Sequence, residues 1–475
     1  MRVAILTSEA VPFAKTGGLA DVSGALPKAL QQHNVDVRLI LPLYEQIDRT
    51  LLNGGSVENV RVEWRGQVHQ VRFWFSDAAG APAYLLETPE FFARPSIYGY
   101  NDDHIRFAFF SRAALALLKY LDWRPEVVHG NDWPCGFAMV ELRARRRYEE
   151  FFQKTRSLFS LHNVGYQGLF DAGDLWWLGF GEAPERELFM LDGHASALKA
   201  GIIAADALST VSPRYAREIQ TPEQGHGVDW LLRARSDRLV GITNGVDYDI
   251  WNPETDPHIA ANFSSDDLSG KRECKIDLLR RFGLPEDADR PILATISRLV
   301  GQKGYDLIRQ ISGWILETGS FVIALGKGAQ EYEDFLQGWH DSAPRQVGIY
   351  KGYAGEPLAH QIEAGADMFL MPSLYEPCGL NQMYSMRYGT VPIVRATGGL
   401  DDTVQQFNPD TGTGTGFKFG PYDAGALREK IREALYFYAR SKDWQEIQHN
   451  GMLVDNSWEA AAEKYLNLYQ EVTEL

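Results

Sequence analysis

Cysteine is scarce in this sequence. Three cysteines occur in 475 residues, Cys135, Cys274 and Cys378, and no two of them have C-x-x-C spacing. Disulfide scaffolds and zinc ribbons need an even or closely spaced set of cysteines. The sequence therefore predicts a cytoplasmic protein that has no disulfide framework.

Long apolar runs are missing as well. The nearest candidate, residues 107–121, is interrupted by Ser111, Arg112 and Lys119. A helix that spans a bilayer needs about 20 predominantly apolar residues. The first residues of the chain carry too short an apolar stretch for a secretory signal. We therefore expect neither a membrane-spanning segment nor a signal peptide.

An excess of positive charge is also absent. Lysine and arginine total 47 against 63 acidic residues, which gives a formal net charge of −16 at pH 7. A field of that sign repels nucleic acids and anionic membranes. Neither is expected as a partner, although a local cluster of lysine and arginine can still bind a small anionic substrate.

Several catalytic motifs do not occur. The sequence contains no G-x-x-x-x-G-K-[ST], H-E-x-x-H or G-x-S-x-G motif, which argues against P-loop NTPases, zincins and hydrolases with a nucleophile elbow. No G-x-G-x-x-G follows the first predicted strand, as a Rossmann dehydrogenase would require. One Asp-x-Asp occurs, at Asp287 and Asp289, but it precedes a predicted strand and is interpreted as a turn. No metal site is inferred.

Short β-branched runs alternate with longer helical stretches along the chain, which is typical of parallel α/β sheets. One series of predicted strands comprises residues 3–7, 37–41, 60–62, 70–75, 127–129, 158–161 and 207–211. A second series comprises residues 292–296, 321–325, 347–350, 368–371, 391–394 and 416–419. A chain of this length exceeds one hydrophobic core. We therefore predict two doubly wound α/β domains, residues 1–243 and 244–456. An amphipathic helix within residues 457–475 follows, and the sequence leaves open which domain it packs on.

Polar residues follow the predicted strands of the first domain, where ligands of open α/β sheets bind. Lys15 and the pair Gly17-Gly18 lie between the first strand and the next helix. A glycine pair lets backbone N–H groups approach an anion closely, and Lys15 adds positive charge. A glycine turn beside a solvent-exposed lysine is the alternative. His129 and His162 end two further strands, which indicates a shared cleft, and His162 is the better candidate for a functional role.

The second domain repeats this arrangement. Arg298 and Lys303 follow the strand at residues 292–296, and a planar guanidinium with a mobile ammonium suits a diphosphate. The strand that ends at Met371 leads to the segment 376–380, where backbone amides would face phosphate and Glu376 would project toward the ligand. Surface cations and a carboxylate that caps a helix are the alternative interpretations.

Together these segments resemble one family, the bacterial glycogen synthases and plant starch synthases that use ADP-glucose. The matching segments keep the family order over nearly the whole chain: Lys15-Thr16-Gly17-Gly18-Leu19-Ala20-Asp21-Val22, His162-Asn163 with Tyr166-Gln167-Gly168, Asn244-Gly245-Val246-Asp247, Ser297-Arg298-Leu299 with Gln302-Lys303-Gly304, Glu376-Pro377-Cys378-Gly379-Leu380 and Thr397-Gly398-Gly399-Leu400. The resemblance implies a GT-B architecture, in which two Rossmann-like domains face each other across a deep cleft and the last helix crosses back to the first domain.

The resemblance also implies roles for individual residues. Catalysis would involve His162, Glu376, Arg298 and Lys303. The ADP-glucose donor would contact Lys15, Gly17, Gly18, Asn244, Tyr353, Cys378, Gly379 and Leu380, with Tyr353 stacked on the adenine. The glucose and acceptor site would include Asp21, Tyr98 and Asn163.

The implied reaction transfers α-D-glucose from ADP-glucose to the 4-hydroxyl at the non-reducing end of an α-1,4-glucan such as glycogen, with retention of configuration and without metal or cofactor. Lys15-Thr16-Gly17-Gly18 favours ADP-glucose over UDP-glucose. A UDP-sugar, another acceptor, or a glucan-binding protein without catalysis are the alternatives. The sequence departs from the family pattern at residues 326–330, where an acidic turn is usual, and at Tyr384, where the wider superfamily often has glutamate. The oligomeric state is not predicted.

Overall fold

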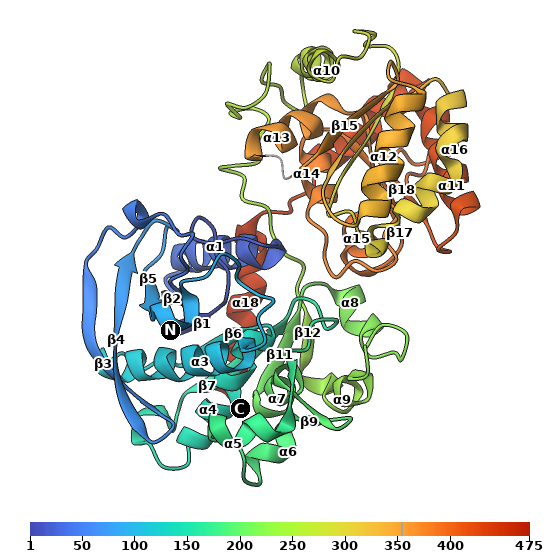
Figure 1. The fold of residues 1–475 in the computed structure, drawn as a ribbon. Coiled ribbons are helices and arrows are strands. Elements are labelled where there is room, and N and C mark those ends of the chain that lie inside the picture. Colours follow the sequence, from blue (N-terminus) through green and yellow to red (C-terminus); the bar gives the residue numbers. More distant parts are fainter. Residues whose placement is uncertain (353–354) are drawn as a thin grey trace. The chain divides into compact units, whose positions relative to one another are not determined.

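The computed structural model describes residues 1–352 and 355–475, and its chain forms two compact units. Unit 1 comprises Met1–Gly245 and Trp458–Leu475, and unit 2 comprises Val246–Ser457 (Figure 1). Both ends of the chain therefore belong to unit 1. At the start of unit 2, the N–H of Val246 donates to the carbonyl of Asn456 at 2.7 Å, so the entering and leaving segments lie side by side.

The sheet of unit 1 has nine strands in the order β12-β11-β7-β6-β1-β2-β5-β4-β3. Its strands are β1 (Arg2–Leu6), β2 (Asp36–Pro42), β3 (Ser56–Trp64), β4 (Gln67–Ser76), β5 (Ala83–Glu87), β6 (Val127–Asn131), β7 (Arg156–Leu161), β11 (Ala207–Thr210) and β12 (Leu239–Gly241). The strands from β12 to β5 are parallel, and β4 and β3 extend the sheet antiparallel. A small separate sheet contains β8 (Leu169–Phe170), β9 (Met190–Leu191) and β10 (His194–Ser196).

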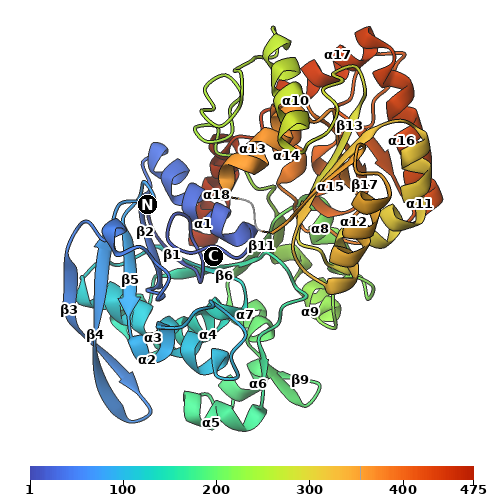
Figure 2. The ribbon, with the colours of Figure 1, turned by 45° about the horizontal axis from the view of Figure 1, so that its top comes forward.

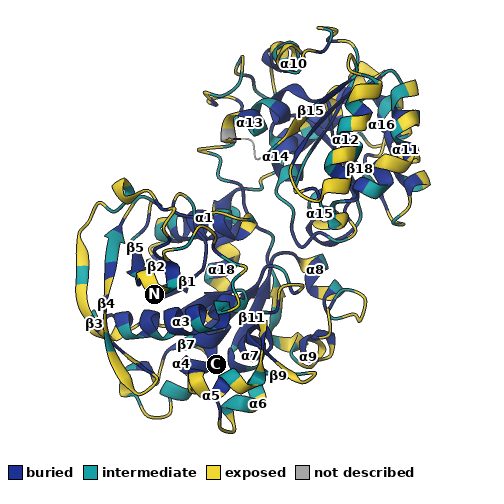
Figure 3. Cartoon of the chain, viewed as in Figure 1, coloured by how far each residue is buried: buried dark blue, intermediate teal, exposed yellow. Residues whose placement is uncertain are grey.

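The helices of unit 1 surround this sheet. They are α1 (Gly18–Gln32), α2 (Pro89–Phe92), α3 (Asp103–Tyr120), α4 (Gly136–Arg145), α5 (Leu175–Leu178), α6 (Glu185–Phe189), α7 (Ala197–Ala204), α8 (Pro213–Glu218), α9 (Asp229–Ala234) and α18 (Trp458–Thr473). Parallel strands that are covered on both faces are buried along their length. Accordingly β6 and β11 are entirely buried, whereas the outer faces of the helices are exposed (Figure 3).

The last helix packs within unit 1. In Figures 1 and 2, α18 lies beside α1 and β6. The side chains of Tyr465 and Tyr469 on α18 lie against His129. His129 was expected to end its strand, but it lies in the middle of β6, which continues to Asn131. Nδ1 of His129 is 2.8 Å from the Tyr469 hydroxyl, and Nε2 is 2.5 Å from the hydroxyl of Ser160. Burial lowers the pKa of His129 to about 3, so its imidazole is neutral. His129 therefore serves to attach α18 to the sheet.

The sheet of unit 2 has six parallel strands in the order β15-β14-β13-β16-β17-β18. They are β13 (Ile292–Ile296), β14 (Phe321–Gly326), β15 (Val347–Lys351), β16 (Met368–Met371), β17 (Val391–Arg395) and β18 (Phe417–Phe419). Successive strands run outward from β13 in one direction and then from β16 in the other, which is the doubly wound Rossmann order. The predicted α/β fold class is confirmed for both units.

Helices cover both faces of the unit 2 sheet. They are α10 (Ser269–Arg281), α11 (Tyr305–Glu317), α12 (Gln330–Ser342), α13 (Glu356–Gly365), α14 (Asn381–Arg387), α15 (Gly398–Thr403), α16 (Ala424–Tyr438) and α17 (Ser441–Met452). One apolar cluster joins the sheet to α11, α12, α16 and α17, and a second joins it to α10, α13 and α15. Alternate strand residues such as Leu293 and Ala294 enter opposite clusters, as the pleat of a strand requires.

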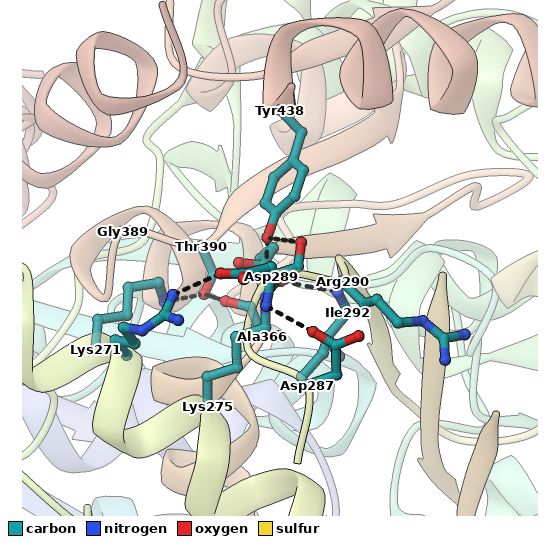
Figure 4. A network of polar contacts seen from close by, with 12 residues as sticks. Lys271, Lys275, Asp287, Asp289, Arg290, Ile292, Ala366, Gly389, Thr390 and Tyr438 are labelled. Carbon is teal, nitrogen blue, oxygen red and sulfur yellow. Dashed lines mark hydrogen bonds and ion pairs between the residues drawn. The ribbon is translucent and has the colours of Figure 1, made fainter. Parts of the chain in front are cut away.

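Two buried lysines of α10 hold neighbouring elements together (Figure 4). Lys271 donates to the carbonyls of Ala364 and Tyr388, at the carboxyl ends of α13 and α14, and to the hydroxyl of Thr390. Lys275 forms an ion pair with Asp367 at 2.7 Å. An ammonium at a helix carboxyl end satisfies free carbonyls and opposes the negative end of the helix dipole.

Asp287 and Asp289 form a turn, as predicted, because the N–H of Asp289 donates to the carboxylate of Asp287. Among the described residues no group of His, Cys, Asp and Glu could hold a metal ion. No helix within the described ranges is long and apolar enough to cross a membrane.

Candidate active site

The order of the strands places a topological switch point in each unit. In unit 1 it lies between β1 and β6, and in unit 2 between β13 and β16. Loops at the carboxyl ends of two such strands diverge and leave room for a ligand. In unit 1 these loops carry Lys15 and Asp132, and in unit 2 they carry Lys303 and Glu376. Each unit thus has its own group of polar loops at the switch point, which is called its half-site.

The loop between β1 and α1 contains Lys15, Gly17 and Gly18. The Lys15 ammonium lies 2.6 Å from a carboxylate oxygen of Asp21, so these two predicted site residues form an ion pair. The backbone N–H of Gly17 is already occupied, because it donates to the carboxylate of Glu9 at 3.0 Å. Gly18 begins α1. The backbone N–H of Gly17, which was expected to bind an anion, therefore already binds the carboxylate of Glu9.

Tyr98 contacts the same carboxylate. Its hydroxyl donates to Glu9 at 2.7 Å and lies 2.7 Å from the hydroxyl of Ser8. Burial and the nearby Glu9 raise the pKa of Tyr98 well above its usual value, so the hydroxyl keeps its proton. Tyr98, predicted to line the acceptor site, is therefore joined through its hydroxyl to the Lys15 loop.

His162 follows β7 and is held by Asn131 at the end of β6. Nδ2 of Asn131 donates to the carbonyl of Leu6, so its Oδ1 accepts from Nε2 of His162 at 2.9 Å. This hydrogen bond places the imidazole proton on Nε2 and leaves Nδ1 as an acceptor. Burial lowers the pKa of His162 to about 4. The imidazole is therefore neutral at neutral pH, with Nε2–H donating to Asn131 and Nδ1 able to accept, and it does not act as a general acid.

Asp132 is not among the site residues that the sequence analysis predicts. Its carboxylate accepts from the N–H of His162 at 2.7 Å, and desolvation raises its pKa to about 7. Its backbone has φ 54° and ψ −179°, a conformation that residues other than glycine rarely adopt and that is frequent at functional sites. The signal in the sequence is a carboxylate placed directly after a predicted strand.

Asn163 and Asn244 are the remaining predicted residues of unit 1. The side chain of Asn163 accepts from the N–H of Gly165 at 3.0 Å and so shapes the turn after His162. Asn244 is 6% exposed, and its Oδ1 is buried without a hydrogen-bond partner among the described residues. A buried oxygen without a partner is costly to the fold, which makes Asn244 a candidate for contact with a ligand.

In unit 2, Lys303 and Glu376 face each other across the switch point. The ammonium of Lys303 lies 2.6 Å from Oε2 of Glu376, and the hydroxyl of Ser373 donates to the same oxygen at 3.0 Å. The side chains of Lys303 and Glu376 are 18% and 7% exposed. Arg298 is exposed, and its guanidinium makes no hydrogen bond or ion pair with any described residue. Arg298 is therefore available to an anion, whereas Lys303 is engaged.

The segment Cys378, Gly379 and Leu380 connects this half-site to α14. The side-chain amide of Gln382 donates to the carbonyls of Cys378 and Gly379, both at 3.1 Å. Gly379 has φ 71°, a conformation that favours glycine, and Leu380 precedes the first residue of α14. The segment is thereby fixed in a tight turn. Tyr353, the predicted adenine contact, lies outside the described residues.

At residues 326–330 and at Tyr384, where the sequence departs from the family pattern, the structure shows close packing. Gly326 and Gly328 flank Lys327, whose carbonyl accepts from the N–H of Leu299 at 3.0 Å. A Cβ at either glycine would collide with the backbone beside Leu299, so the two loops can pack closely only with glycine there. Tyr384 stacks on Trp251 with ring centroids 3.9 Å apart, which fixes the segment that follows the start of unit 2.

Comparisons with known proteins agree with this geometry. Residues 2–234 match the family model of the starch synthase catalytic domain, and residues 279–451 match that of glycosyl transferases group 1. The glycogen synthase of Clostridium beijerinckii is 43% identical over 479 residues, covering 100% of this chain and 99% of that protein. The glycogen synthase of Bacillus cereus strain Q1 is 42% identical, with both proteins covered completely.

Solved structures give the same result. The catalytic domain of starch synthase IV from Arabidopsis thaliana, bound to ADP and acarbose, is 33% identical with a TM-score of 0.91, covering 100% of this chain and 99% of that one. Sucrose-phosphate synthase from Thermosynechococcus elongatus is 19% identical with a TM-score of 0.63 over 100% of this chain and 99% of that one, a likeness of fold alone.

Two doubly wound units with polar loops at their switch points define a glycosyltransferase of the GT-B class. With relatives this similar over its whole length, the chain belongs to the glycogen synthase and starch synthase family, and the predicted resemblance is confirmed.

Proposed function

We propose that this enzyme transfers α-D-glucose from ADP-glucose to the 4-hydroxyl at the non-reducing end of an α-1,4-glucan, with retention of configuration. The observation that carries the proposal is the pair formed by Lys303 and Glu376 at the switch point of unit 2. A cation suits the departing diphosphate and a carboxylate suits sugar hydroxyls. The Arabidopsis relative was solved with ADP and acarbose, and we carry this nucleotide over to the present chain.

In this proposal the diphosphate contacts three cations. Cleavage of the glycosidic bond builds negative charge on ADP, which Arg298, Lys303 and Lys15 would stabilise. These three positive charges would make a metal ion or cofactor unnecessary. Activity is therefore expected to be unchanged after treatment with EDTA. A loss of activity that magnesium restores would contradict this part of the proposal.

The sugar contacts follow from the hydrogen-bonding capacity of the side chains. Glu376 would accept from hydroxyls of the donor glucose, and Nδ1 of His162 would accept from another hydroxyl. Asp21, Tyr98 and Asn163 would border the acceptor glucan. The leaving phosphate would take the proton of the acceptor hydroxyl on the same face of the sugar.

The adenosine and the phosphates would contact a further set of residues. The proposed set is Asn244, Tyr353, Cys378, Gly379 and Leu380, together with Gly17 and Gly18. We also propose that the enzyme works in the cytoplasm, since its three cysteines are buried and form no disulfide with any described residue.

The test is incorporation of radiolabelled glucose into glycogen by the purified protein, with ADP-glucose and UDP-glucose compared at equal concentration. The proposal predicts that ADP-glucose is the much better donor, with release of one ADP for each glucose incorporated. Incorporation from UDP-glucose and not from ADP-glucose would show that UDP-glucose is the donor. No incorporation from either donor, despite a folded protein, would point to a glucan-binding role without catalysis.

A further inference from the structure

The buried carboxylate of Glu9 lies inside the loop that carries Lys15. Glu9 follows β1, is 4% exposed and has three hydrogen-bond donors around its side chain. Oε2 accepts from the N–H of Thr16 at 2.5 Å and from the N–H of Gly17 at 3.0 Å. Oε1 accepts from the hydroxyl of Tyr98 at 2.7 Å. No role has been given to Glu9 in the reaction proposed above.

These contacts fix the backbone on one side of Lys15. On the other side, Ala14 is fixed by Ala10, because each donates its N–H to the carbonyl of the other, at 2.9 and 3.0 Å. Lys15 therefore lies between two clamped residues, Ala14 and Thr16. Its side chain is half exposed and bound to Asp21 alone among the described residues, so the backbone determines where the ammonium can reach.

Glu9 is itself held in place. Its N–H donates to the hydroxyl of Thr7, and the same hydroxyl lies 3.0 Å from that of Ser23 on α1. Burial raises the pKa of Glu9, while the donors from Thr16, Gly17 and Tyr98 oppose that rise. A buried carboxyl that is anchored through its own backbone and saturated with donors is suited to hold a loop and not to react.

We propose that Glu9 is a positioning residue, which holds residues 15–18 in the shape that binds the donor diphosphate. This inference rests on the proposed function of Lys15. The reach of the Glu9 side chain and its acceptor oxygens matter more here than its negative charge, because Glu9 binds two backbone amides and one hydroxyl.

Two variants of Glu9 distinguish the effect of side-chain length from the effect of negative charge. Glu9→Gln keeps the length of the side chain, and its amide oxygen can still accept from Thr16 and Gly17 while its NH₂ donates to Tyr98. Glu9→Asp keeps the charge but is one methylene shorter and cannot span both backbone amides. We expect Glu9→Asp to raise the KM for ADP-glucose about tenfold or more, since the shorter side chain leaves a buried backbone N–H without its acceptor. Glu9→Gln keeps an acceptor for both N–H groups and is expected to stay within about threefold of the original protein.

The measurements are KM and kcat for ADP-glucose at saturating glycogen, with melting temperatures and with Glu45→Ala as an exposed acidic control. Glu9→Asp is expected to change KM much more than kcat. The reverse order, with Glu9→Gln impaired and Glu9→Asp near normal, would overturn the proposal in favour of a purely electrostatic role. Equal KM values for all three proteins would overturn it as well.

A double-mutant cycle with Lys15→Ala tests whether Glu9 acts through the loop. If it does, Glu9→Asp raises the KM of the Lys15→Ala variant only slightly. If the two residues act independently, the changes in free energy derived from KM are additive. Additive effects would contradict the inference. If Lys15→Ala alone leaves KM unchanged, the proposed role of Lys15 fails, and the order of the two Glu9 variants still decides whether Glu9 positions the loop.

Discussion

The ion pair of Lys303 and Glu376 leads to an unusual prediction: Glu376→Gln should bind ADP more tightly while it loses turnover. The Lys303 ammonium lies 2.6 Å from Oε2 of Glu376. If Lys303 binds the diphosphate, this pair must first be separated. Removing the charge of Glu376 lowers that cost, although it also removes the proposed contact to the donor glucose.

The expected gain in ADP affinity can be calculated from the ion pair of Lys303 and Glu376. Coulomb's law gives about 6 kcal/mol for unit charges 2.6 Å apart at an effective dielectric constant of about 20. Desolvation of the two charges offsets most of this. A hydrogen bond to a charged group contributes about 1.5–3 kcal/mol net, against about 0.5–1.5 kcal/mol between neutral groups. The difference of about 1–1.5 kcal/mol corresponds to an affinity for ADP about 5- to 10-fold higher.

Isothermal titration calorimetry measures the affinity for ADP directly, and incorporation of labelled glucose measures turnover. Glu429→Gln, at an exposed ion pair of the same unit, is the matched control and should bind ADP as the original protein does. The double variant Lys303→Ala/Glu376→Gln should show no gain over Lys303→Ala. Unchanged or weaker ADP binding by Glu376→Gln would refute the reasoning that Lys303 is shared between Glu376 and the diphosphate.

Three further predictions follow from the structure. Lys303→Ala should lower kcat/KM for ADP-glucose by orders of magnitude with an unchanged melting temperature; activity near that of the original protein would exclude its role at the diphosphate. Asp132→Asn should lower kcat/KM and remove a pH dependence near 7, because the pKa of Asp132 is raised to about 7; an identical pH profile in both proteins would show that this carboxyl does not titrate in the active enzyme. Burial lowers the pKa of Lys271 to about 8 from its usual 10.5, so the unfolded chain binds more protons in that interval and this residue makes the free energy of unfolding rise with pH above about 8. Urea denaturation at pH 8 and pH 9.5 should show that contribution in the original protein and not in Lys271→Met, and the same pH dependence in both would contradict it.

Much of the fold could be predicted because the central strands are nearly continuous apolar runs. All six strands of unit 2 coincide with predicted runs, since most of their residues are buried between two layers of helices. Strand β5 was not predicted, because its sequence Ala-Tyr-Leu-Leu-Glu contains no β-branched residue. It forms a strand through its pairing with β2 and β4, which is a tertiary effect.

The candidate site was only partly predictable. Polar residues after strands indicated which loops matter, and the functional roles came from the family resemblance. The pairing of Lys303 with Glu376 joins residues 73 positions apart, and no local pattern indicates it. Glu9 and Asp132 were visible as carboxylates after strands, but most of their partners are backbone N–H groups, which every residue except proline carries. Sequence alone therefore could not show which amides they bind.

The chain leaves unit 1 once and returns once, at neighbouring positions. Unit 2 is thus a single uninterrupted stretch of sequence, whereas unit 1 is assembled from two pieces, the second of which supplies Tyr469 beside His129. Residues 246–457 can therefore be produced as one recombinant fragment for nucleotide binding studies. A fragment that stops at residue 245 would expose the buried surface that Tyr465 and Tyr469 cover, and for unit 1 the C-terminal helix must be supplied as a separate peptide or rejoined by a designed linker.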